Sequence, residues 1–146
     1  MTHFFSLIPA VGAILPAKGR YDVVFDSSSR ADAGAFIFRF WINDVTRPAA
    51  RLLKKSVAVD GSLLLRVTDR GSGIDPGSLS TVIDGVGVKA SYSRTKNRVA
   101  IPVGSLSRGT HRLTFQVSDY QESRNMENVG RILPNTRILR TTFVVR

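Results

Sequence analysis

The sequence predicts an all-β protein, and three observations support this prediction. Apolar and polar residues alternate along several segments, as they do in strands with one buried face. β-branched and aromatic residues are frequent in the same segments. No window of about a dozen residues keeps a helical period. From Arg47 to the end there are 100 residues with several short strands, which is the size of an immunoglobulin-like antiparallel β-sandwich.

The clearest alternation lies in the segments AFIFRFWIND, SLLLRVTD, HRLTFQVSD and LRTTFVVR. The residues expected on their buried faces are, in that order, Phe36, Phe38, Phe40 and Ile42; Leu63, Leu65 and Val67; Leu113, Phe115 and Val117; and Leu139, Thr141, Phe143 and Val145. Shorter strands are expected at Tyr21–Phe25, Val57–Val59, Thr81–Ile83, Val88–Tyr92 and Val99–Val103.

A linker is expected in the segment VTRPAA, because Pro48 cannot donate to a strand ladder and holds Arg47 in extended geometry. The chain then divides into residues 1–46 and an immunoglobulin-like β-sandwich over residues 47–146. Residues 1–46 offer two or three strands, too few to be stable alone. We therefore interpret them as the C-terminal part of a preceding, incomplete β domain or as a strand extension.

The apolar faces of residues 1–46 need a cover. Burial of a large apolar side chain stabilises by roughly 1.5–3 kcal/mol, so leaving seven such side chains in water would cost on the order of 10 kcal/mol. The seven are Tyr21, Val23, Phe25, Phe36, Phe38, Phe40 and Ile42. We expect this segment to pack on residues 47–146 or to self-associate through the strand at residues 36–42.

Composition narrows the possible chemistry. Cysteine is absent, which excludes disulfides, thiol catalysis and thiolate metal sites. The net charge is +10, and residues 48–146 hold sixteen of the basic and seven of the acidic groups. Such an excess attracts polyanions such as nucleic acid or an anionic cell-surface polymer. The candidate contacts, if they share one sheet face, are Arg66, Arg112, Arg140 and Arg146. The alternative is that arginine only solvates exposed strand faces.

The longest apolar run, Phe4–Ala17, is interrupted by Ser6, Pro9, Gly12 and Pro16. It is shorter than the ~20 residues of a membrane helix, so no membrane span is expected. It is either the apolar part of a signal peptide that ends near Ala17 or an extended segment on a sheet. The absence of Lys and Arg from its first residues favours the extended segment.

The segment DRGSGIDPGSL, residues 69–79, contains the closely spaced acidic residues and glycines that are typical of ligand-binding loops. It does not fit a dinucleotide fingerprint, because the third glycine, Gly77, comes one place late and no helix follows. It does not fit an EF-hand, because glycines stand where oxygen ligands are needed. We interpret it as a turn in which Asp75 caps and Pro76 opens a single helical turn.

A looser calcium site remains open, because three expected strands end at Asp44, Asp69 and Asp119. If the strands that end at Asp69 and Asp119 are neighbours in one sheet, their carboxylates lie together. Asp75 and the Asn125–Glu127–Asn128 group then extend the ligand set. The alternative is that each acid caps its own turn. The predicted metal ligands are therefore Asp69, Asp75 and Asp119, and no cofactor other than calcium is suggested.

No catalytic motif is present. The chain has only His3 and His111, and no serine lies in a nucleophile elbow. We therefore expect a protein that is not an enzyme. The seventeen-residue segment Tyr120–Thr136 between two strong strands is the best candidate for a contact surface.

The stretches DRGSGIDPGSLSTVIDG, SRGTHRLTFQVSDY and TTFVVR resemble bacterial immunoglobulin-like domains appended to secreted and cell-surface proteins. FDSSSRADAGAFIFRFWINDVTRP, with SDYQESRNMENV and LPNTR, is similar to the C-terminal tails of secreted subtilisin-like serine peptidases. The match spans nearly all of residues 20–146, and no position matches the peptidase triad. The resemblance implies a secreted or cell-surface accessory module that spaces, stabilises or docks the other domains of its parent protein.

Overall fold

The computed structural model describes residues 44–123 and 135–146. The expected strands at Tyr21–Phe25 and at residues 36–42, the run Phe4–Ala17 and the Asn125–Glu127–Asn128 group lie outside the described residues. Nine strands occupy the described part: β1 Ala49–Leu52, β2 Ser56–Val57, β3 Ser62–Thr68, β4 Ser80–Ile83, β5 Val86–Gly87, β6 Ser91–Ser93, β7 Arg98–Pro102, β8 Gly109–Ser118 and β9 Thr136–Val145.

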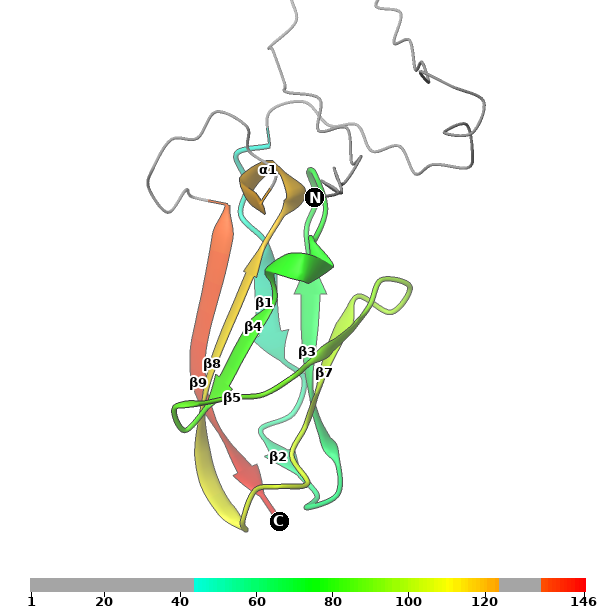
Figure 1. The fold of residues 1–146 in the computed structure, drawn as a ribbon. Helices are drawn as coiled ribbons and strands as arrows, with labels where there is room; N and C mark the ends of the chain where they lie inside the picture. Colours follow the sequence, from blue (N-terminus) through cyan, green and yellow to red (C-terminus); the bar gives the residue numbers. More distant parts are fainter. Residues whose placement is uncertain (1–43, 124–134) are drawn as a thin grey trace, which may run out of the picture.

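These strands form the two layers of a β-sandwich (Figure 1). One sheet has the order β1-β3-β7-β6 and the other the order β2-β9-β8-β4-β5. Every pairing is antiparallel except that of β2 with β9, which is parallel. In an immunoglobulin fold, strands A, B, E and D form one sheet and G, F and C the other. The strands β1, β3, β7 and β6 and the strands β9, β8 and β4 follow this order, so the predicted fold class is confirmed.

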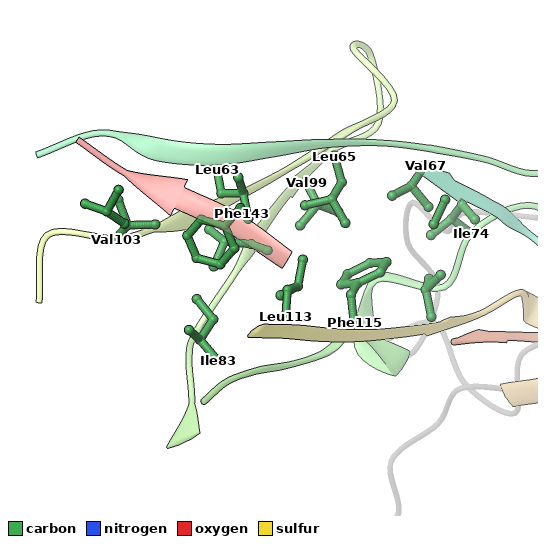
Figure 2. Packing of buried hydrophobic residues seen from close by; sticks show 14 residues of the cluster. Leu63, Leu65, Val67, Ile74, Ile83, Val99, Val103, Leu113, Phe115 and Phe143 are labelled. Carbon is green, nitrogen blue, oxygen red and sulfur yellow. The ribbon is translucent and has the colours of Figure 1, made fainter. Parts of the chain in front are cut away.

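The core lies between the two sheets, where alternate side chains of each strand meet (Figure 2). Leu63, Leu65 and Val67 project from β3 toward Leu113 and Phe115 of β8, and all five are at most 1% exposed. In β3, β8 and β9 the alternate residues that were expected to face the core are the ones that face it. Period-two alternation therefore identified the inner face of both sheets correctly.

The shortest strands were missed or placed inaccurately. The segment VTRPAA was expected to be a linker, yet Ala49 and Ala50 already pair with β3. Of the strand expected at Val88–Tyr92, only Ser91 and Tyr92 lie in a strand, β6, because residues 88–90 carry the chain from β5 of the five-stranded sheet to β6 of the four-stranded sheet. β5 and β6, of two and three residues, carry too few alternations to be recognised, whereas the four-residue strand β4 was expected at Thr81–Ile83 and is found at Ser80–Ile83.

Two short helical turns lie near the end of the sandwich where β3 and β8 end, which we call the upper end. The first is the 3-10 helix η2, Pro76–Ser78, with Asp75 as its N-cap and an Asp75 Oδ1 to Gly77 N distance of 2.8 Å. This confirms the interpretation of the loop as a capped turn. The second, α1 at Tyr120–Ser123, was not expected, since four residues show no helical period.

The residues that the structure describes contain no helix that is long and apolar enough to cross a membrane.

His111 lies at the opposite, lower end, at the beginning of β8, and is 7% exposed. Its Nδ1 is 2.6 Å from Asp84 Oδ2 and its Nε2 is 2.9 Å from the main-chain oxygen of Ser107. Both neighbours are acceptors, so these two contacts favour the protonated imidazole, in which both ring nitrogens donate. The hydrogen bond to Asp84, helped by that to Ser107, raises the pKa of His111 above its ordinary value of 6.5.

We expect this contact to make stability depend on pH. A histidine whose folded-state pKa is raised stabilises the fold fully below its unfolded value, 6.5, and loses this contribution as pH rises through the folded value. Urea unfolding across that window checks the prediction, with the free energy of unfolding falling as pH rises. His111→Gln removes this titration, and a variant that keeps the full slope would contradict the assignment.

Candidate metal centre

Three carboxylates from distant parts of the chain converge at the upper end. Asp44 precedes β1, Asp69 follows β3 and Asp119 follows β8. One carboxylate oxygen of each lies within 4.8 Å of those of the other two. The sequence placed the carboxylates of Asp69 and Asp119 together on the condition that their strands are neighbours in one sheet, and this condition is not met, because β3 and β8 lie in different sheets. The acids meet because both strands end at the same end of the sandwich.

Asp44 is 7% exposed and is held by the loop that follows β3. Its Oδ2 accepts from the N–H of Ser72 at 2.6 Å, and its Oδ1 accepts from the N–H of Thr46 at 2.9 Å. Burial acts to raise the pKa of Asp44, but these hydrogen bonds to its carboxylate outweigh burial, and the pKa is lowered. The side chain is therefore a fixed carboxylate that points into the group.

Gly71 makes this placement of Asp44 possible. A Cβ atom at position 71 would lie 2.1 Å from Oδ2 of Asp44, so only glycine lets the carboxylate rest against the loop. Asp69 holds the same loop, since its Oδ2 accepts from the N–H groups of Gly71 and Gly73 at 2.9 and 2.8 Å. Asp69 thus caps its own turn with one oxygen, while its Oδ1 is buried and has no hydrogen-bond partner in the described part.

Asp119 is fully buried, and its carboxyl group lies beside that of Asp44. Two carboxyl groups in contact cannot both stay charged unless a cation lies with them, so they share either a proton or a cation. The main-chain N–H of Asp119 donates to the main-chain oxygen of Asn135 at 3.3 Å. This hydrogen bond brings the residue before β9 into the same corner of the sandwich.

Asn135 adds a fourth side chain that sequence reasoning missed. Its Nδ2 donates to the main-chain oxygen of Asp44, and the residue is only 2% exposed. Its Oδ1 is buried without a hydrogen-bond partner among the described residues. A buried amide oxygen left in this way costs about 1–3 kcal/mol unless something at the site satisfies it. Nothing in the segment LPNTR marked this asparagine as a possible ligand.

Asp75, a predicted ligand, is not one of the three converging acids. Its Oδ1 caps η2, as described above. The Asn125–Glu127–Asn128 group, expected to join the site, lies outside the described residues. Of the predicted ligands, the structure therefore brings together Asp69 and Asp119, with Asp44 from the same set of strand ends.

The donor set at the upper end is composed of oxygen. Carboxylate and amide oxygens on loops suit calcium, which accepts six to eight such ligands in flexible geometry. Structural zinc sites are built from thiolate and imidazole, and neither is among the converging groups. Within residues 44–123 and 135–146, no Lys or Arg forms an ion pair with Asp44 or Asp69. Protein cations therefore do not neutralise these two acids in the described part.

The four arginines expected to form one contact surface are divided between the sheets. Arg66 lies on the outer face of the four-stranded sheet, whereas Arg112 and Arg140 lie on the other sheet and Arg146 follows β9. The condition that they share one sheet face is therefore not met. Arg112 also lies beside Asp84, which accepts its main-chain N–H at 2.8 Å, so its charge is partly compensated.

The His111–Asp84 pair does not have the geometry of a catalytic dyad. In a serine hydrolase the outer ring nitrogen faces a hydroxyl nucleophile. Here Nε2 contacts the main-chain oxygen of Ser107. The pair holds the beginning of β8 against the turn at Asp84 and offers no activated nucleophile.

No protein-family model matches the chain, and no curated protein sequence does. Among solved structures, CopC from Methylosinus trichosporium OB3b is similar, with 19% sequence identity and a TM-score of 0.43. The match covers 66% of this chain and 93% of CopC. A likeness this distant carries no argument about the site. The resemblance to tails of subtilisin-like peptidases remains a prediction.

Proposed function

We propose that this chain is a non-catalytic β-sandwich module of a secreted or cell-surface protein, and that calcium bound at its upper end fixes the junction with the residues that precede β1. Asp44 is the central residue in this proposal, because it lies at the point where the chain enters the sandwich. A cation shared by Asp44, Asp69 and Asp119 would tie that entry to the ends of β3 and β8.

The observation that carries the proposal is the convergence of three carboxylates at a site where buried oxygens lack a hydrogen-bond donor among the described residues. Three carboxylates lie within 4.8 Å of one another. Asp69 Oδ1 and Asn135 Oδ1 are buried oxygens without hydrogen-bond partners in the described part. A divalent cation supplies the charge and the coordination that such a set of oxygens lacks. The accessory role in a parent protein rests on the sequence resemblance, and a subtilisin-like peptidase is the parent we propose.

Calorimetric titration of the EDTA-treated protein with calcium tests the metal site. We expect one site and a thermal midpoint that rises with calcium concentration. At a free calcium concentration about 100 times Kd, binding stabilises by about 2.7 kcal/mol. In a domain of this size each kcal/mol shifts the midpoint by roughly 4–8 °C, so we expect an increase of about 10–20 °C.

Asp69→Asn and Asp119→Asn each remove one charge from the converging acids and are expected to abolish most of the calcium-dependent shift. Asp60→Asn is the matched control, since it makes the same change at an exposed loop residue outside the group. Absence of a heat signal and of a midpoint shift in the wild-type chain would refute the metal site. Hydrolysis of casein by the purified chain would refute the non-catalytic role.

A further inference from the structure

The outer face of the four-stranded sheet carries a row of three arginines. Arg51 of β1 is in register with Arg66 of β3, and Arg66 is in register with Arg98 of β7. All three are exposed. Adjacent strands are about 4.8 Å apart, so the row crosses three strands in about 10 Å. We call these residues the arginine row.

Nothing in the described fold compensates this charge. The strands β1, β3, β7 and β6 contain no Asp or Glu. No arginine of the row forms an ion pair with a described residue. Like charges directly opposite each other on neighbouring strands destabilise a sheet. The central residue, Arg66, has such a neighbour on both sides, so the row weakens the fold and needs another explanation.

We propose that the arginine row binds a linear polymer with one phosphodiester per repeat and no bases, such as a polyol phosphate. This goes beyond the proposed calcium site and does not depend on it. The row is a single file of charges, which matches a chain better than a broad anionic membrane. The planar guanidinium group of arginine binds two phosphate oxygens at once, so each residue of the row can hold one phosphate.

The residues around the row exclude a nucleic-acid strand as the preferred ligand. Proteins that bind single strands stack bases on exposed aromatic rings. The aromatic residue of these four strands is Tyr92, which packs against the core on the inner face. The outer-face positions beside the row are Ala49, Leu64, Thr68, Ala100 and Ser93, and none of them is aromatic. Because these neighbours include no aromatic ring, the outer face offers bases no stacking platform, and the exposed guanidinium groups stay accessible to a polymer without bases.

Titration with poly(glycerol phosphate), followed by fluorescence anisotropy in EDTA and again in calcium, tests the proposal. We expect binding in both buffers, because the row does not use the acidic group. Three phosphate contacts predict a loss of affinity of roughly 20-fold between 50 and 200 mM salt. The triple variant Arg51→Gln, Arg66→Gln and Arg98→Gln is expected to lose binding by at least roughly tenfold and to flatten the salt dependence.

A second triple variant removes the same charge elsewhere: Arg108→Gln, Arg140→Gln and Arg146→Gln, all exposed and outside the row. This variant is expected to keep most of the binding, and equal losses in the two variants would overturn the proposal. Tighter binding of an oligothymidylate with the same number of phosphates would overturn the choice of polymer. The thermal midpoint of the first variant should stay the same or rise, which separates lost contacts from lost folding.

Discussion

Replacing Phe115 with alanine is expected to reduce the free energy of unfolding by about 3–5 kcal/mol. Phe115 lies in the middle of β8, is fully buried and faces β3 across the sandwich (Figure 2). Its truncation removes the packing of one aromatic ring between the two sheets. The surrounding strands are held in place by their pairing within the sheets, so they cannot move in to fill the cavity. Against a typical total of about 5–15 kcal/mol, this loss removes a large share of the stability.

Urea denaturation monitored by circular dichroism measures this effect. Gln116→Ala is the control, because it truncates the next residue of the same strand, which points outward and is exposed. We expect the control to change stability by less than about 0.5 kcal/mol. Similar losses in the two variants would mean that the inner face of β8 is assigned incorrectly.

The inner faces of the long strands could be predicted because each carries several alternations. β3, β8 and β9 have seven to ten residues. A shift of one residue in the assignment of their inner face would place all their apolar side chains in solvent. β1, β5 and β6 have two to four residues and gain their conformation from pairing with neighbours. That pairing is a tertiary effect, and the local sequence holds no sign of it.

The metal centre could be predicted only in part. Asp69 and Asp119 stood out because each directly follows a recognisable strand, and strand ends must gather at the ends of a sandwich. Which strands end together depends on the sheet order, and the sequence does not specify it. Asn135 could not be found, because its contribution depends on a hydrogen bond to Asp44, ninety-one residues earlier. Asp75 was chosen for proximity in sequence, whereas its geometry is that of a cap.

Replacing Gly71 with alanine is expected to weaken calcium binding by about 10–100-fold, the range seen when a group that orients a metal ligand is lost. The added Cβ would lie 2.1 Å from Oδ2 of Asp44, so the carboxylate must leave its place beside Ser72. The φ angle of Gly71 is not positive, so the expected effect comes from the collision and not from backbone strain.

Stability measured in EDTA and in calcium separates the two consequences of Gly71→Ala. In EDTA the variant should lose about 1–3 kcal/mol, because the Ser72 N–H loses its buried acceptor. In calcium the difference from wild type should grow, since the displaced carboxylate no longer reaches the cation. Gly87→Ala is the control, because its Cβ meets nothing within 4 Å. Wild-type calcium affinity in Gly71→Ala would show that Asp44 does not bind the ion, and the site would then reduce to Asp69, Asp119 and Asn135.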